Sequence, residues 1–113
     1  MKILFVCGMN QQRSPTAEKI YQHDPRVEAR SAGLSESSPR RLSAKDIEWA
    51  DLILVMERNH ERRIVEGFQG IVNLPQIECL NISPDLNYMT PELIAQIKAA
   101  AEPYIKHYAK RAL

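Results

Sequence analysis

A short apolar run near the start of the chain is followed at once by a polar loop and the start of a helix. Residues 2–6 include four consecutive apolar side chains, Ile3 to Val6, which is typical of a strand buried on both faces of a parallel sheet. Residues 7–13 are mainly polar, and Ser14-Pro15 then offers an N-cap and a first-turn proline for a helix reaching about His23. This order of strand, loop and helix favours an alternating α/β fold.

The rest of the chain repeats the alternation. Ser43 is a predicted helix N-cap with Asp46 as its capping-box partner. We expect further strands over residues 27–32, 51–56 and 76–82, and further helices over 43–50, 58–68 and from Thr90 onward. The last helix is expected to kink at Pro103. In the helix over 58–68, the predicted inner face consists of Ile64, Val65 and Phe68. The predicted fold is a three-layer α/β sandwich around a four-stranded parallel sheet. Ligands bind such sheets at the carboxyl ends of the strands, where the loop 7–13 lies.

Length, charge and residue usage narrow the class of protein. A chain of 113 residues is expected to form one domain over 1–113. A formal net charge of +1 does not favour nucleic acid as a partner. The first apolar run is too short for a signal peptide or a membrane span, so we expect a cytoplasmic protein with no membrane partner. The cysteines and histidines show no metal-ligand spacing, so no metal or cofactor is expected, and the histidines His23, His60 and His107 are assigned to helix ends or solvated faces.

The chemistry is predicted to lie in a loop that begins with a cysteine and ends with an arginine six positions later. Its residues are Cys7, Gly8, Met9, Asn10, Gln11, Gln12 and Arg13. A tight loop can turn its N–H groups inward as an anion nest, the helix start adds positive potential, and Arg13 can bind two phosphate oxygens through its planar fork. The same field favours a nucleophilic thiolate at Cys7. A lone cysteine at a strand end is more often a small core residue, but the flanking strand, Ser14-Pro15 and helix favour the functional interpretation.

These residues resemble the signature of the low-molecular-weight protein tyrosine phosphatases, and the sequence is most similar to a compact bacterial subgroup. Cys7, Asn10, Arg13, Ser14 and Pro15 match the signature, and the resemblance continues at Glu18, Ser31-Ala32-Gly33 and residues 50–56. It implies a phosphocysteine mechanism in which Cys7 attacks phosphorus while Arg13 and the amides of the loop bind the phosphate oxygens. It also implies that the Ser14 hydroxyl donates to the Cys7 sulfur and that Asn10 holds the loop in a strained conformation.

The chain departs from the family pattern at several points. Gly8-Met9 replaces an order in which glycine comes one place later, and Gln12 stands where many members carry a second cysteine that protects the first. The stretch 34–41, which helps to line the substrate wall in longer members, is reduced to a few mainly polar residues. We therefore expect neither disulfide protection of Cys7 within the loop nor an extended wall.

The general acid and the rim of the site are predicted from a late loop. The family places an aspartate before a proline, whereas here Asp85 follows Pro84. Asp85 is the candidate acid, and its alternative role is that of a turn residue bonded to nearby backbone. Tyr88 either stacks on an aryl phosphate or packs against the last helix, and Arg40 is either a rim residue or a solvated charge. Asp24-Pro25 is rejected as the acid because it follows the first helix.

Together these patterns predict a phosphomonoester hydrolase of the protein tyrosine phosphatase type. Its substrate would be a phosphorylated protein or a small aryl phosphate. One alternative is an arsenate reductase on the same scaffold, for which Cys79, within the fourth predicted strand, is the only second thiol. The other is a phospho-ligand binding module without turnover. The physiological substrate and the oligomeric state stay open.

Overall fold

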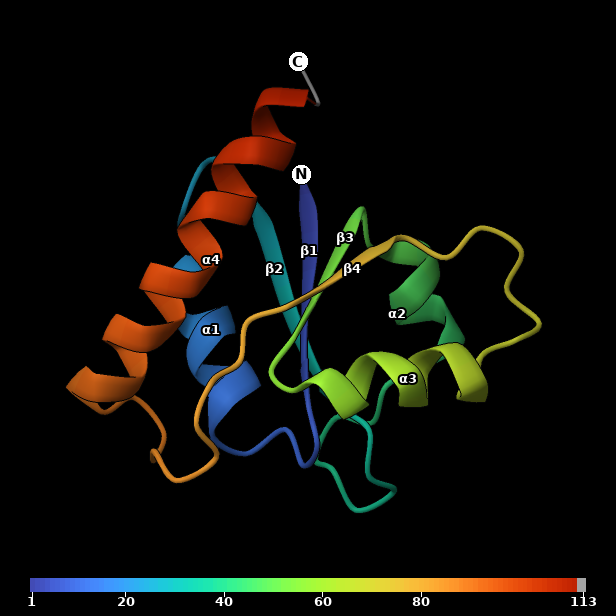
Figure 1. Ribbon diagram of the computed structural model, residues 1–113, viewed down its shortest axis with the longest axis horizontal. Coiled ribbons are helices and arrows are strands. Elements are labelled where there is room, and N and C mark those ends of the chain that lie inside the picture. Colours follow the sequence, from blue (N-terminus) through green and yellow to red (C-terminus); the bar gives the residue numbers. More distant parts are fainter. Residues whose placement is uncertain (112–113) are drawn as a thin grey trace.

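The computed structural model describes residues 1–111 and contains alternating strands and helices (Figure 1). Their bounds are β1 Lys2–Cys7, α1 Arg13–Tyr21, β2 Glu28–Gly33, α2 Ala44–Trp49, β3 Leu52–Val55, α3 Arg58–Gly67, β4 Gln76–Cys79 and α4 Pro91–Arg111. The strands form one four-stranded sheet in the order β2-β1-β3-β4, and every neighbouring pair is parallel. The predicted four-stranded parallel sheet is confirmed.

Helices cover both faces of the sheet, because side chains of a strand point alternately to opposite sides. In β1, Ile3, Phe5 and Cys7 belong to the core under α1 and α4, which also holds Ala17, Leu93 and Ile97. Leu4 and Val6 belong to the opposite core under α2 and α3, together with Ile47 and Ile64. Figure 1 shows the two helix pairs on either side of the strands. The three-layer arrangement is therefore as predicted.

The order of the strands creates the place where a ligand can bind. β1 lies between β2 and β3, so the chain crosses to one side of β1 after α1 and to the other side after α2. A crevice forms at the carboxyl ends of two such strands because their following connections run to opposite faces. The loop after Cys7 starts at this switch point, directly beside the end of β3 at Val55.

Several element boundaries differ from the sequence predictions. Helix α1 begins at Arg13, and its N-cap is Gln12 without a side-chain cap bond, so the predicted cap at Ser14 is wrong. Strand β4 ends at Cys79, and Asn81 just beyond it has a φ of 54°, which interrupts the extended conformation. The capping box of Ser43 and Asp46 is confirmed.

The predicted inner face of α3 is only partly correct. Ile64 is fully buried, whereas Val65 is 43% exposed. Phe68 is partly buried against the core that contains Ile64. Among the described residues, no helix has the length and apolar character needed to cross a membrane.

Candidate active site

The Cys7 sulfur lies at the start of the loop and is surrounded by hydrogen-bond donors. Cys7 is buried, and its Sγ accepts the backbone N–H of Asn10 at 3.2 Å. The Ser14 Oγ lies 2.9 Å from the same sulfur. Two groups that can donate a hydrogen bond thus face the sulfur of the predicted nucleophile.

Asn10 supports this arrangement from inside the loop. It is buried, and its φ of 54° lies in the left-handed region that few residues other than glycine, asparagine and aspartate adopt. Its Nδ2 donates to Ser14 Oγ at 2.9 Å and to Ser31 Oγ at 3.1 Å, and Ser31 in turn donates to Glu18. Ser14 Oγ accepts from Asn10, and its own hydrogen has two acceptors within reach, the Cys7 sulfur at 2.9 Å and the Ala32 carbonyl at 3.4 Å. Ser14 is thus used by the site, which explains why it does not cap the helix.

Arg13 is held by two groups from the carboxyl ends of β3 and β4. Its Nη1 donates to the Ile82 carbonyl at 3.0 Å, and its Nη2 forms a 2.6 Å ion pair with Glu57 Oε2. A guanidinium has five N–H donors, so three are left for oxygen atoms of a ligand. Sequence analysis missed this role of Glu57. The available signal was an acidic residue close to the end of the third strand, at the sheet edge that binds ligands.

His60 lies beneath the same loop and carries no charge at neutral pH. It lies in the first turn of α3, in line with its assignment to a helix end or a solvated face, but it is buried, with 3% exposed. Its Nδ1 accepts the backbone N–H of Glu57 at 3.2 Å, and a Cβ built on Gly8 would lie 3.9 Å from its Nε2. Burial lowers the pKa of His60 to about 4, while the charge of Glu57 opposes the shift. The neutral imidazole therefore adds no positive charge beside Arg13.

The loop 7–13 lines a hollow that contains several polar residues and one arginine. The residues that line it are Cys7, Gly8, Met9, Gln11, Gln12, Arg13 and Pro84. The structure thus brings together the predicted nucleophile, the predicted clamp and most of the predicted loop residues. Asn10 does not line the hollow, because its side chain is turned inward to Ser14 and Ser31.

This chain resembles known proteins in its three-dimensional structure. Neither a protein-family model nor a curated protein matches the sequence. Many solved structures match this chain over nearly its whole length, and three of them illustrate the similarity. The YwlE arginine phosphatase from Geobacillus stearothermophilus has 25% identity and a TM-score of 0.63, with 98% of this chain and 92% of that chain covered.

The other two are named as tyrosine phosphatases. SP-PTP, a low-molecular-weight protein tyrosine phosphatase from Streptococcus pyogenes, has 15% identity and a TM-score of 0.72, covering 94% of this chain and 91% of its own. Wzb from Escherichia coli K30, solved in complex with phosphate, has 22% identity and a TM-score of 0.63, covering 97% and 96%. The chain has the low-molecular-weight protein tyrosine phosphatase fold. The resemblance found in the sequence is thereby confirmed.

Within this low-molecular-weight phosphatase fold, the loop that contains Asp85 and Tyr88 contacts the loop 7–13 through Gln12. The backbone N–H of Tyr88 donates to Gln12 Oε1, and the Tyr88 side chain is exposed. Asp85 is exposed and lines a neighbouring hollow with Leu86, Asn87, Thr90, Pro91 and Glu92, whereas Pro84 lines the loop hollow itself. Asp85 thus lies one residue from the wall of the loop hollow. Its backbone N–H donates to Ser83 Oγ at 3.3 Å.

Arg40 is engaged away from the loop hollow of the phosphatase fold. Its Nη2 lies 3.4 Å from Asp46 Oδ1, and it does not line the loop hollow. The residues after β2 instead support the loop through their backbone. Leu34 N–H donates to the Cys7 carbonyl at 3.0 Å, and Ser35 N–H donates to the Gly8 carbonyl at 2.8 Å.

Gly33 allows this close approach of the two loops in the phosphatase fold. A Cβ at position 33 would lie 2.1 Å from Ser38 Oγ and 2.9 Å from Asn10 Cβ. We expect Gly33→Ala to reduce stability by about 1–3 kcal/mol through overpacking, and to lower catalytic activity because Asn10 must shift. Chemical denaturation together with phosphatase assays checks both effects. Gly70→Ala is the matched control, since nothing lies within 4 Å of a Cβ there, and an equal effect in both variants would contradict the prediction.

Proposed function

We propose that this chain is a cysteine-dependent phosphatase of the protein tyrosine phosphatase type. The observation that carries the proposal is the position of the Cys7 sulfur and Arg13 in the wall of one hollow at the switch point of the sheet. A phosphate in this hollow would meet a nucleophile, a bidentate cation and the backbone amides of the loop residues that line it, Gly8, Met9, Gln11 and Gln12. The donors of Asn10 and Ser14 on sulfur prepare Cys7 for attack.

The proposed reaction has two steps. In the first, the Cys7 thiolate attacks phosphorus, the bond from phosphorus to the leaving oxygen breaks, and that oxygen takes a proton from Asp85. In the second, water attacks the phosphocysteine with Asp85 as base, which releases phosphate and restores the thiolate. Arg13 and the loop amides stabilise the charge on the equatorial oxygens in both steps. A free thiol is required, so we place the enzyme in a reducing compartment such as the cytoplasm.

Asp85→Asn tests the acid. We expect about a 10²-fold loss on alkyl phosphates and a smaller loss on p-nitrophenyl phosphate, because a positioned acid helps most when the leaving oxygen is basic. Rates across a series of leaving groups measure this contrast. Glu92→Gln is the matched control, since Glu92 lines the same hollow. Equal losses on all esters for Asp85→Asn would show that Asp85 only shapes the loop, and a contrast in Glu92→Gln would make Glu92 the acid.

The proposed substrate is a phosphotyrosine-containing protein or a small aryl phosphate. Phosphoarginine is a second candidate, because the 25% identical structure is named as an arginine phosphatase. Peptides that carry either phosphoresidue in the same sequence, assayed in parallel for phosphate release, distinguish the two. The preferred substrate is the one with the higher kcat/KM.

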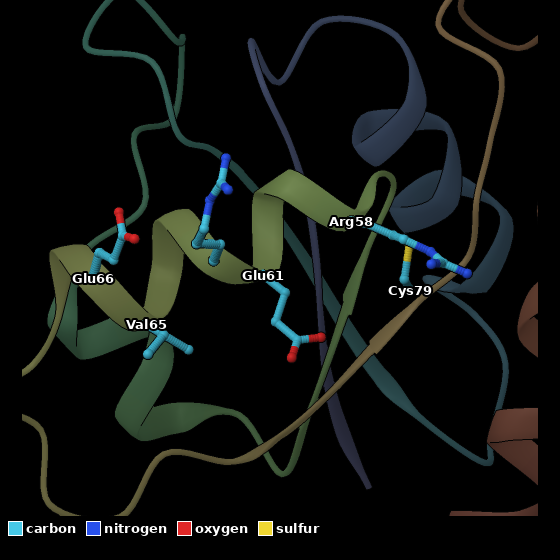
Figure 2. Close-up of a pocket in the computed structure, with 6 residues that line it drawn as sticks. Arg58, Glu61, Val65, Glu66 and Cys79 are labelled. Carbon is cyan, nitrogen blue, oxygen red and sulfur yellow. The ribbon is translucent and has the colours of Figure 1, made fainter.

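A direct comparison of reactions tests the proposal as a whole. Hydrolysis of p-nitrophenyl phosphate with inhibition by vanadate supports a phosphatase, whereas arsenate-dependent consumption of thiols supports the reductase. The geometry does not favour the reductase. Cys79, the only other cysteine, donates its S–H to Asn81 Oδ1 at 3.4 Å and lines a different hollow beside Arg58 and Val65 (Figure 2).

A further inference from the structure

A second hollow adjoins the loop hollow at the same edge of the sheet. It is lined by two segments that follow β3 and β4, residues 56–59 and 81–84. Pro84 lines both hollows, so the two adjoin at this residue. A substrate with its phosphate on the loop can extend past Pro84 into the second hollow.

The chemistry of this second hollow is dominated by hydrogen-bond donors. Arg58, Asn59, Asn81 and Ser83 all contribute polar side chains to its lining. Asn81 uses its oxygen to accept from Cys79, which leaves its amide N–H groups for a ligand. The only carboxylate in the lining is that of Glu57, and it is bound to Arg13. An anionic group therefore meets donors here.

The positive charge in the lining of the second hollow is that of Arg58. This residue is exposed, and like Arg62 and Arg63 on the same helix it forms no ion pair with any residue in the described range 1–111, but of these three only Arg58 lines this hollow. Figure 2 shows its side chain leaving the first turn of α3 and running toward the chain that follows β4. Arg58 lines both this hollow and the one beside Cys79, so the residue lies at their shared border.

We propose that this second hollow is a subsite for an acidic residue that flanks the phosphorylated residue of a peptide substrate, and that Arg58 determines this preference. The inference rests on the proposed phosphatase function and names its substrate class more closely. A residue adds about 3.3–3.6 Å to an extended chain, so a neighbour within two positions of the phosphoresidue is the relevant one. Arg58 then pairs with its carboxylate, while Asn59 and Asn81 bind the remaining oxygen or the peptide backbone.

The test uses phosphotyrosine peptides that carry Glu, Gln or Lys at one flanking position, within two residues on either side. For the wild-type enzyme we expect kcat/KM to fall in the order Glu, Gln, Lys, with about a two- to fivefold step between Glu and Gln, as for an exposed ion pair. The step should shrink with added salt. Arg58→Gln should remove the preference, and Arg58→Glu should reverse it. Arg62→Gln is the matched control, because Arg62 lies one turn further along α3 and does not line this hollow.

The outcomes separate this inference from the proposed function. If p-nitrophenyl phosphate is hydrolysed but wild type shows no charge preference, or if the preference survives in Arg58→Glu, the subsite is excluded while the phosphatase stands. If nothing is hydrolysed, the proposed function fails. Fluorescence anisotropy of the same peptides with the Cys7→Ser variant still decides the subsite in that case, because it measures binding without turnover. Tighter binding of the Glu peptide that Arg58→Glu reverses supports the inference, and equal binding of all peptides overturns it.

Discussion

Cys7→Ser is expected to lower kcat for p-nitrophenyl phosphate by about 10⁴-fold or more while the protein stays folded, since nucleophile removal in other enzymes has costs of this order. A serine hydroxyl is a weak nucleophile at neutral pH unless a neighbouring base activates it. The groups that face the Cys7 sulfur are the Asn10 N–H and the Ser14 hydroxyl. Both act as donors toward an anion, and neither is a base, so the loop that supports a thiolate does not activate an alcohol.

The fold should tolerate this change because serine and cysteine have similar shapes and Ser14 and Asn10 can bond to either atom. Thermal unfolding of the variant, and vanadate binding to it, separate the loss of the nucleophile from damage to the loop. Cys79→Ser is the matched control, because that thiol lies outside the loop hollow. Residual hydrolysis within about a hundredfold of wild type, or an equal loss in the Cys79 variant, would exclude Cys7 as the nucleophile.

Local features of the fold could be predicted from the sequence because they depend on neighbours in the chain. The apolar run before Cys7 fixes a buried strand, and Ser43 with Asp46 caps α2 through bonds between residues three apart. The Cys7–Arg13 loop is also local, which is why the proposed nucleophile and the proposed clamp are brought together by one strand end and one helix start.

The remaining features depend on contacts between distant segments. Ser14 looks like a helix cap in sequence, but its hydroxyl bonds with Asn10 and Cys7, and the helix begins two residues earlier than predicted, at Arg13. Glu57 and His60 reach the site only because β3 pairs with β1 in a register that places Val55 beside Val6. From the sequence alone, the charged residues at the start of α3 are expected to face solvent, because the pairing of β3 with β1 is not known at that point. The two roles were therefore not visible in the pattern of residues.

Arg13→Lys is expected to lower kcat/KM for aryl phosphates by about 10³-fold or more and to weaken vanadate inhibition in parallel. Arg13 binds the Ile82 carbonyl and Glu57 with two of its donors, which aims the remaining face of the guanidinium into the hollow. A lysine ammonium has three donors that do not lie in a plane. It cannot keep both anchors and also hold two phosphate oxygens, and each preorganised donor lost at a developing charge costs about 10²–10³-fold.

The same substitution removes the ion pair with Glu57, so stability must be measured beside activity. Unfolding midpoints of wild type and variant identify a temperature at which both are fully folded, and the rates are compared there. Arg62→Lys provides the control for an arginine-to-lysine change on the exposed surface of α3. A loss of stability with an unchanged rate and unchanged vanadate inhibition would mean that Arg13 only joins α1 to the ends of β3 and β4. A rate loss that is equal for every ester, together with weaker binding of vanadate, would identify Arg13 as the phosphate clamp. The reason is that the equatorial oxygens are common to all substrates, whereas the leaving group differs between them.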